Sequence, residues 1–238
     1  MPAESAATWL IVPTFNEAPN VEPLVDALRG VLPQSRRILI VDDSSPDGTG
    51  RLADQLAASN DDVEVLHRPQ KQGLGPAYLD GFRRALDGGA ELVIQMDADF
   101  SHDPAYVTRL IDAARNADLV LGSRYVSGGG VTEWGPIRRL ISRGGSAYAR
   151  IWLGVPVQDL TGGFKCWRRE TLEAIDLDSV DSKGYAFQVE MTFRAIEAGL
   201  RVAEVPIVFR DRRVGKSKMT RGIVAEAIWR VPALRLKQ

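Results

Sequence analysis

The sequence has few of the residues that build disulfides, zinc clusters and hydrolytic triads. Its 238 residues include one cysteine, Cys166, and two histidines, His67 and His102. A single cysteine excludes an intramolecular disulfide, and so few thiols and imidazoles exclude the usual zinc cluster. Ser44 and Ser45 lie in no G-x-S-x-G elbow, and neither histidine has an evident serine partner. Hydrolysis by a catalytic triad is therefore disfavoured.

Long apolar runs and an excess of one charge are also missing. No uninterrupted apolar stretch approaches the roughly 20 residues that span a bilayer. The N-terminal segment MPAESAATW has no basic region followed by an apolar one, so the sequence predicts no signal peptide. A formal net charge of −1 gives no electrostatic reason to expect a nucleic-acid partner. We expect a cytoplasmic protein whose membrane contact, if any, is peripheral, at the inner face.

Positive charge is nevertheless concentrated in the second half. Residues 135–150 contain four arginines and no acid, and residues 208–221 contain six basic residues against one acid. Because the average charge conceals these two segments, we expect local positive fields there, suited to anionic ligands.

The apolar pattern predicts a single α/β domain over residues 1–238. The first half alternates between buried strands and amphipathic helices, which implies a mostly parallel sheet with helices on both faces. The expected strands are 8–14, 36–43, 63–67 and 91–97, and the expected helices are 20–32, 49–59 and 75–86. Beyond these lie a strand at 118–125, a helix at 134–154, a helix at 185–198, a strand at 201–209, a basic loop at 209–219 and a final helix. We assign residues 1–122 to a ligand-binding half and 123–238 to a second half.

Polar, acidic or glycine-rich segments follow each of the first four predicted strands. They are Pro13-Thr14-Phe15-Asn16-Glu17, Asp42-Asp43-Ser44-Ser45-Pro46-Asp47-Gly48, Lys71-Gln72-Gly73-Leu74-Gly75 and Asp97-Ala98-Asp99. Open parallel sheets bind ligands outside the carboxyl ends of their strands. The four segments therefore predict one shared site.

Asp97 and Asp99 carry the sharpest chemical signal. Residues two apart on a strand point to the same face, and two neighbouring carboxylates are unfavourable without a cation. Oxygen ligands of this kind suit Mg²⁺ or Mn²⁺, shared with substrate phosphates. We expect Asp103 to lie outside this pair as an N-cap or turn residue.

The sequence does not contain a complete copy of either of two other nucleotide-binding motifs. Gly73-Leu74-Gly75 begins a dinucleotide fingerprint, but Tyr78 stands where its third glycine belongs, and the segment follows the third strand. No G-x-x-x-x-G-K-[ST] occurs anywhere, which excludes a P-loop.

In their order along the chain, these segments resemble the family 2 glycosyltransferases of the GT-A fold. The narrower resemblance is to the polyprenol-phosphate (dolichol-phosphate) mannose synthases, and it runs from about Leu10 to Thr220. It rests on the four segments above and on Gly122-Ser123-Arg124-Tyr125, Asp159-Leu160-Thr161-Gly162-Gly163-Phe164-Lys165, Phe209-Arg210-Asp211-Arg212 and Gly215-Lys216-Ser217-Lys218-Met219.

The resemblance implies transfer of mannose from GDP-mannose to a polyprenyl phosphate, with inversion and with Mg²⁺ or Mn²⁺. It makes residues 1–122 the half that binds the nucleotide-sugar donor and residues 123–238 the acceptor and membrane-proximal half, and it implies a role for each matched residue. The nucleotide-sugar site would comprise Pro13, Thr14, Asn16, Glu17, Asp42, Asp43, Asp47, Lys71, Ala98, Arg210 and Lys216, and the metal site Asp97, Asp99 and Ser101. The acceptor phosphate would meet Arg124, Arg138 or Arg139, and Ser142, with Asp159 beside them. Family members occur with and without transmembrane segments, so a membrane partner subunit is one option.

Acceptor chemistry supports arginines rather than a general base. A phosphate monoester has a second pKa of about 6, so it is already anionic at neutral pH. It needs positioning, which the guanidinium fork supplies. We therefore expect Asp159 to orient another group, and we take Asp97, Asp99, Arg124 and Asp159 as the catalytic set.

Several alternatives stay open. Asp42 could cap the following turn, His102 could be structural, and the arginines of the 134–154 helix could form a solvated face. The apolar face of that helix, with Ile137, Leu140, Ile141, Tyr148, Ile151 and Trp152, could pack in the core or lie in a membrane interface. The rival activities are polyprenyl-phosphate glucosyl transfer from UDP-glucose, a non-catalytic nucleotide-sugar scaffold, and a phosphatase or nucleotidyltransferase.

Overall fold

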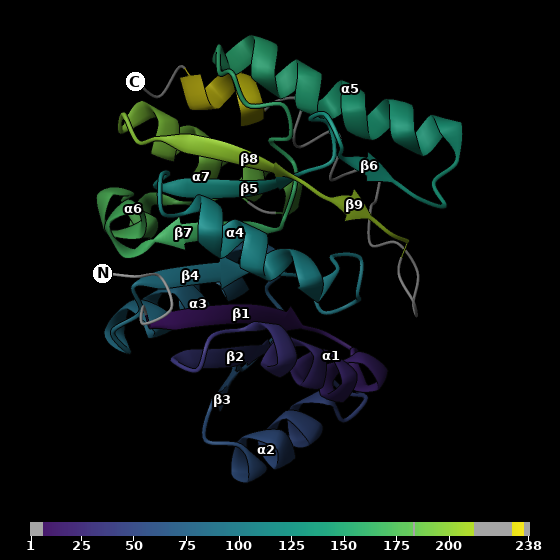
Figure 1. Cartoon of the computed structure of the whole chain (residues 1–238), viewed down its shortest axis with the longest axis vertical. Coiled ribbons are helices and arrows are strands. Elements are labelled where there is room, and N and C mark those ends of the chain that lie inside the picture. Colours follow the sequence, from purple (N-terminus) through teal and green to yellow (C-terminus); the bar gives the residue numbers. More distant parts are fainter. Residues whose placement is uncertain (1–6, 183, 212–229, 236–238) are drawn as a thin grey trace.

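A computed structural model describes residues 7–182, 184–211 and 230–235. A seven-stranded sheet crosses the molecule in the order β3-β2-β1-β4-β7-β5-β8 (Figure 1). Its strands are β1 Thr8–Thr14, β2 Arg36–Asp42, β3 Val63–His67, β4 Leu92–Gln95, β5 Leu119–Ser123, β7 Lys165–Arg168 and β8 Val202–Pro206. All neighbours pair in parallel except β7, which runs antiparallel to both β4 and β5. The predicted mostly parallel α/β fold is confirmed.

Helices cover both faces of this sheet. They are α1 Ala18–Val31, α2 Thr49–Ser59, α3 Leu74–Asp87, α4 Val107–Ala113, α5 Pro136–Leu153, α6 Arg169–Ala174 and α7 Gly184–Glu197, with short 3₁₀ turns η1 Pro104–Tyr106 and η2 Leu177–Ser179. Residues 230–235 are helical as well. Because side chains alternate along a strand, Ile11 joins the core under α3, α6 and α7, while Leu10 joins the core under α1 and α4. No helix within the described ranges is both long and apolar enough to cross a membrane.

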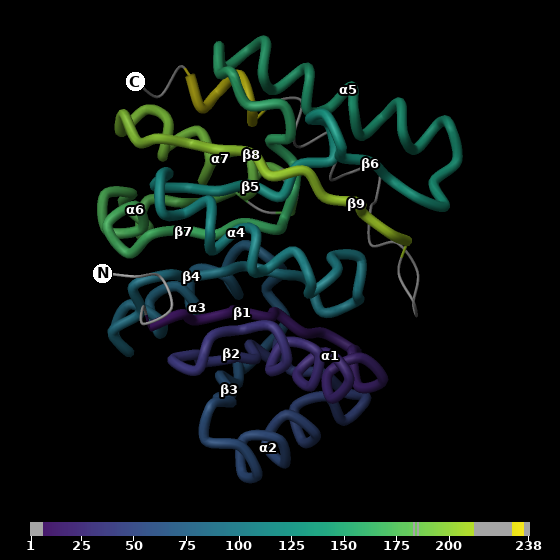
Figure 2. The backbone as a smooth tube through the Cα atoms, in the orientation of Figure 1, coloured from purple at the N-terminus to yellow at the C-terminus, as the bar shows by residue number. Residues whose placement is uncertain are grey.

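Chain order maps onto position along the sheet. The purple and blue first part of the chain forms β1, β2 and β3, and the teal to yellow-green later part forms β5, β7 and β8 (Figure 2). The carboxyl ends of β1, β2, β3 and β4 therefore adjoin one another, as the four strand-end segments predict.

Two expectations about strands need correction. The expected strand 91–97 ends at Gln95, so Asp97 and Asp99 lie in a turn, and strand alternation does not orient them. The expected strand 201–209 breaks at Ile207, whose amide bonds Ser123 O. Beyond that break, β9 Val208–Phe209 leaves β5 and pairs with β6 Gly130–Val131. Through this change of pairing partner, the chain after β9 reaches the turn that follows β4, where Arg210 N donates to Ser101 O.

Candidate active site at the carboxyl ends of the strands

Asp42 ties the ends of β1 and β2 together. Its buried carboxylate accepts hydrogen bonds from Thr14 Oγ1 (3.1 Å), Ser45 N (3.1 Å) and Ser45 Oγ (2.6 Å). Asp42 therefore caps the turn after β2, the structural alternative considered for it.

The loops after β1 and β2 form one unit. Glu17 N donates to Thr49 Oγ1 (3.0 Å), and Ala18 N donates to Asp47 Oδ2 (3.1 Å). Burial opposes ionisation of Asp47, but hydrogen bonds from Thr49 and Ala18 outweigh it and lower its pKa. Asn16 is exposed and adopts a left-handed φ of 58°, which turns the chain from β1 into α1. Pro13, still on β1, is half-buried.

Asp43 joins the loop after β3 to the end of β2. Its carboxylate is buried, bonds the Arg68 guanidinium, and accepts from the amides of Gln72 (3.2 Å) and Gly73 (3.1 Å). The loop that carries Lys71 is thereby held against β2.

Lys71 crosses back to the first loop. Its Nζ lies 3.6 Å from the centroid of the Phe15 ring, and its side chain is exposed. The structure thus brings the three predicted nucleotide-binding loops into contact along one edge.

The Asp97–Asp99 turn presents oxygen ligands beside these loops. Asp99 is buried and accepts from Ser101 N (3.0 Å), and Asp97 accepts from Tyr78 Oη (3.4 Å). Ser101 Oγ is buried and has no hydrogen-bond partner within the part of the chain that the structure describes. Buried polar atoms are normally paired, so this hydroxyl points to a further ligand in the turn.

These oxygens fit a hard divalent cation. Within the described ranges, no group of three or more His, Cys, Asp or Glu side chains could hold a metal alone. Two carboxylates and a hydroxyl suit Mg²⁺ or Mn²⁺ when substrate phosphates complete the coordination. The donor set therefore matches a metal that arrives with a diphosphate.

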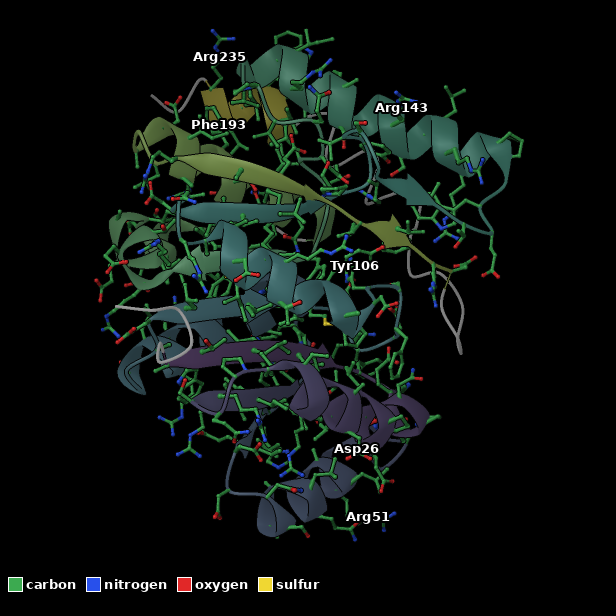
Figure 3. All side chains as sticks on the ribbon, viewed as in Figure 1. Asp26, Arg51, Tyr106, Arg143, Phe193 and Arg235 are labelled. Carbon is green, nitrogen blue, oxygen red and sulfur yellow. The ribbon has the colours of Figure 1, made fainter. Side chains whose placement is uncertain are left out.

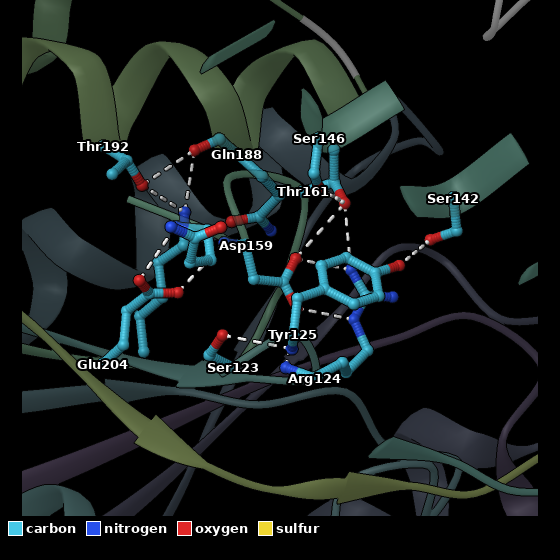
Figure 4. Close-up of polar contacts among 12 residues, drawn as sticks. Ser123, Arg124, Tyr125, Ser142, Ser146, Asp159, Thr161, Gln188, Thr192 and Glu204 are labelled. Atoms are coloured by element: carbon cyan, nitrogen blue, oxygen red, sulfur yellow. Dashed lines mark hydrogen bonds and ion pairs between the residues drawn. The ribbon is translucent and has the colours of Figure 1, made fainter. Parts of the chain in front are cut away.

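Arg124 and Asp159 form a buried bidentate pair across the sheet edge (Figure 4). Arg124 Nε and Nη2 each lie 2.7 Å from an Asp159 oxygen, and the Arg124 amide adds a third bond of 2.9 Å. Arg124 Nη2 also donates to Thr161 Oγ1 (2.9 Å). Burial alone would raise the pKa of Asp159, but the Arg124 charge and hydrogen bonds outweigh it and lower that pKa. The lowered pKa keeps Asp159 ionised beside the Arg124 guanidinium.

Arg138 and Ser142 on α5 lie close to this pair. The Arg138 guanidinium carbon is 4.2 Å from the centroid of Trp134, whose ring is also 5.7 Å from that of Arg124. Ser142 Oγ accepts from Tyr125 Oη (2.7 Å) (Figure 4). By contrast, Arg139 is exposed and bonds Val131 O on β6 (3.2 Å). Of the two candidate arginines, only Arg138 shares a contact with Arg124.

The apolar face of α5 is exposed. Ile137, Leu140 and Ile151 are 73%, 74% and 73% exposed, and Ile141 and Trp152 are 46% and 49% exposed. Core packing of this face, one of the two alternatives, is therefore wrong for these five residues. Such a row of exposed apolar side chains marks an interaction surface.

The strand pair β6–β9 brings Arg210 to the carboxylate turn. Arg210 N donates to Ser101 O (3.1 Å), and its guanidinium lies 3.6 Å from Asp103. Tyr106, labelled in Figure 3, accepts from Val208 N (3.2 Å) and fastens β9 from the other side. Asp103 accepts from Ala105 N (3.0 Å), which confirms its expected place as an N-cap outside the pair.

Some expected residues lie outside the described ranges. They are Lys216, the rest of the basic loop from residue 212, and the part of the expected final helix that precedes residue 230.

His102 is buried, and its ring stacks on Phe164 at 5.0 Å and meets Phe209 edge-on at 5.2 Å. Burial lowers the pKa of His102 to about 4, so its imidazole is neutral near pH 7. This packing favours the structural alternative for His102.

The sequence does not predict a place in the site for four side chains, which are those of Tyr78, Trp134, Lys165 and Gln188. Lys165 is fully buried and donates to Gln188 O (2.7 Å) and Thr192 Oγ1 (2.9 Å). Burial lowers the pKa of Lys165 to about 7, although Asp159 opposes the shift. Its place inside the 159–165 segment was the available signal.

Comparisons with known proteins agree with this geometry. The family model described as glycosyl transferase family 2 matches residues 9–176. Over 218 residues the chain is 50% identical to an undecaprenyl-phosphate mannosyltransferase of Micrococcus luteus, covering 92% of this chain and 89% of the relative. It is also 50% identical over 227 residues to a polyprenol monophosphomannose synthase of Mycolicibacterium smegmatis, covering 94% of this chain and 85% of the relative.

Solved structures share the fold at low identity. Glucosyl-3-phosphoglycerate synthase of Mycobacterium tuberculosis, in complex with Mn²⁺, UDP and phosphoglyceric acid, superposes with a TM-score of 0.69 at 18% identity, covering 96% of this chain and 80% of that one. The same enzyme with Mg²⁺ and UDP gives 0.68 at 18% identity, covering 96% and 81%. The fold is thus that of the GT-A glycosyltransferases, and the chain belongs to glycosyltransferase family 2.

Proposed function

We propose that this enzyme transfers mannose from GDP-mannose to a polyprenyl phosphate, with inversion at the anomeric carbon. One observation carries the proposal: the acidic Asp97–Asp99 turn and the basic Arg124 pair border the same loop. A methyl group placed on Gly162 would lie 3.6 Å from Asp159 Oδ1, and one on Gly163 would lie 3.7 Å from both Asp97 oxygens. Sites for two phosphate groups therefore adjoin, and the relatives' names supply the sugar and the lipid.

At the donor end, Asp97, Asp99 and Ser101 would hold Mg²⁺ or Mn²⁺, which neutralises charge on the departing diphosphate when bound. The structural relatives' complexes with Mn²⁺ or Mg²⁺ and UDP support this use of a metal. Lys71 lies on the adjoining loop, where a cation stabilises the same leaving group.

At the acceptor end, an oxygen of the lipid phosphate attacks the anomeric carbon as the bond from that carbon to the GDP oxygen breaks. A phosphate monoester is mostly dianionic at neutral pH, so no residue must remove a proton. Arg124 and Arg138 would orient the phosphate, and Asp159 fixes the Arg124 guanidinium in place.

A lipid acceptor implies contact with a membrane, and α5 offers a surface for it. We propose that Ile137, Leu140 and Ile151 dock on the cytoplasmic leaflet, while Arg139 and Arg143 beside them meet anionic headgroups. Replacing the three apolar residues with serine should reduce flotation with vesicles of phosphatidylglycerol and phosphatidylcholine several-fold. Arg51→Ser on α2, far from α5 in Figure 3, serves as the control. Unchanged flotation of the triple variant would favour docking through a partner subunit.

The central test is transfer of radiolabelled mannose to a short polyprenyl phosphate in detergent. Wild type should form labelled lipid, and Asp99→Ala should lose several kcal/mol of transition-state stabilisation, about 10³-fold in rate. Asp112→Ala, which removes an exposed carboxylate on α4, should leave the rate unchanged.

A binding measurement and other outcomes of the transfer assay distinguish the rival activities. Calorimetric titration in which UDP binds much more tightly than GDP, with Mn²⁺ present, would overturn the mannose assignment in favour of a UDP-sugar. Nucleotide binding without any transfer would indicate a scaffold. Release of free phosphate or pyrophosphate would indicate a phosphatase or nucleotidyltransferase.

A further inference from the structure

Gln188 holds a buried hydrogen-bond donor that none of the described residues satisfies. The residue lies near the start of α7 and is 2% exposed, and its Nε2 has no hydrogen-bond partner among residues 7–182, 184–211 and 230–235. Buried side-chain amides are almost always bonded at both ends, so each exception needs a cause.

A chain of hydrogen bonds decides which end of the amide stays unpaired. Trp167 Nε1 can only donate, and it donates to Gln95 Oε1 (3.0 Å). Gln95 must then present its Nε2, which donates to Gln188 Oε1 (2.8 Å). The end of the Gln188 amide that stays unpaired is therefore its NH₂ group, which is a donor. Flipping the Gln188 amide would place its NH₂ group against that of Gln95, so that two donors would face each other.

The backbone of Gln188 is also anchored. Lys165 Nζ donates to Gln188 O (2.7 Å) and to Thr192 Oγ1 (2.9 Å), one turn further along α7. With both its carbonyl and its side-chain oxygen held, Gln188 cannot turn its donor elsewhere without breaking one of these bonds.

The unpaired donor borders a space next to Asp97. A methyl group placed on Gly163 would lie 3.4 Å from Gln188 Nε2 and 3.7 Å from both Asp97 oxygens. Because Gly163 has no side chain, nothing from this residue projects between the N–H donor of Gln188 and the carboxylate acceptor of Asp97. A hydroxyl group matches both neighbours, because it accepts one hydrogen bond and donates another.

We propose that Gln188 and Asp97 together recognise one hydroxyl group of the transferred sugar, which accepts from Gln188 Nε2 and donates to Asp97. This inference rests on the proposed function, which places a nucleotide sugar at the Asp97–Asp99 turn. Gln188 is then a specificity residue, and the bonds from Trp167 and Gln95 position its amide.

The test combines Gln188→Leu with GDP-mannose and its four deoxy analogues, lacking the hydroxyl at C2, C3, C4 or C6. In wild type, one analogue should lose about 10- to 100-fold in kcat/KM, the cost of leaving a buried donor unpaired. Gln188→Leu should lose a similar factor with GDP-mannose and little more with that analogue. Gln55→Leu, an exposed glutamine on α2, is the matched control.

Binding alone supplies a second readout. Calorimetry should show that Gln188→Leu weakens GDP-mannose about 10-fold or more while GDP affinity stays within about twofold. Gly163→Ala should do the same, because its methyl group would project between Gln188 Nε2 and the Asp97 carboxylate, where the hydroxyl must approach. This second variant covers the case in which Gln188→Leu fails to fold.

Equal losses on every deoxy analogue in wild type and Gln188→Leu would overturn the inference. So would a fall in GDP affinity as large as that in GDP-mannose affinity, which indicates a structural role. If wild type binds GDP-mannose through Gln188 but transfers no mannose, the inference stands and the proposed function fails.

Discussion

Two buried arginine–carboxylate pairs lie at the two ends of the site, and their surroundings differ. In the donor half, Arg68 bonds Asp43 and also Asp80 (2.8 Å), so two carboxylates face one guanidinium. Asp43 accepts two further hydrogen bonds, from backbone amides of the loop that carries Lys71. The hydrogen bonds of this pair hold a loop in shape.

In the acceptor half, Arg124 bonds the Asp159 carboxylate and lies beside three aromatic rings. The rings of Tyr125, Trp134 and Phe209 lie 5.1, 5.7 and 5.6 Å from its guanidinium carbon. Aromatic faces attract a cation without using its N–H donors. The difference indicates that the two pairs do different work. The Arg68–Asp43 pair orders protein backbone, whereas the Arg124–Asp159 pair keeps a guanidinium oriented beside the position proposed for the acceptor phosphate.

The largest effect should follow from breaking the acceptor pair with Asp159→Asn. Removing one partner of a buried ion pair leaves an uncompensated charge, so the free energy of unfolding should fall by about 3–5 kcal/mol. Transfer should fall about 10²-fold or more while GDP affinity is kept, because only Arg124 loses its orientation. Urea unfolding, transfer kinetics and calorimetry measure the three quantities.

The double variant Arg124→Met, Asp159→Leu separates stability from function. Replacing both charges with apolar groups should restore much of the stability and none of the transfer. A loss in Asp159→Asn that disappeared at high pH would contradict the orienting role, because it would indicate that Asp159 accepts a proton.

Breaking the Arg68–Asp43 pair of the donor half should have a smaller effect, and it should change binding of the donor nucleotide rather than of the acceptor. Arg68→Met leaves Asp43 without its guanidinium, so we expect a loss of about 2–3 kcal/mol in stability and about 10-fold in GDP affinity. The KM for polyprenyl phosphate should not change. Arg83→Met removes an exposed arginine that also bonds Asp80, and it should be neutral. An acceptor defect in Arg68→Met would remove the distinction between the two pairs.

Local pattern was enough for much of the donor half. The strands at 8–14 and 63–67 and the helix at 49–59 have the predicted bounds, because strong apolar periodicity and clear turn residues surround them. The Asp97–Asp99 pair was predicted from the chemistry of its carboxylates, but the geometric reason given for it was wrong, since β4 ends before it. Strand alternation could not reveal that the chain leaves the sheet two residues early.

The acceptor half depends more on contacts between distant residues. β7 has only four residues, includes Lys165 and Arg168, and is inserted antiparallel between β4 and β5. A lysine in a sequence normally indicates a solvated position, so its burial against α7 is not visible locally. The same holds for Gln188, whose orientation is set by Gln95, 93 residues away.

The smallest predicted effect tests how charge is shared around Asp159. Lys165 has a folded-state pKa of about 7 because it is buried, against 10.5 in the unfolded chain. Between those values the unfolded state binds more protons, so the stability of wild type should rise with pH in that window. From pH 7 to 8.5 the gain should be about 1–2 kcal/mol relative to Lys165→Met, as one proton gives at most about 1.4 kcal/mol per pH unit. Parallel curves of unfolding free energy against pH for the two proteins would mean that Lys165 stays charged, and that Arg124 then shares Asp159 with a second cation.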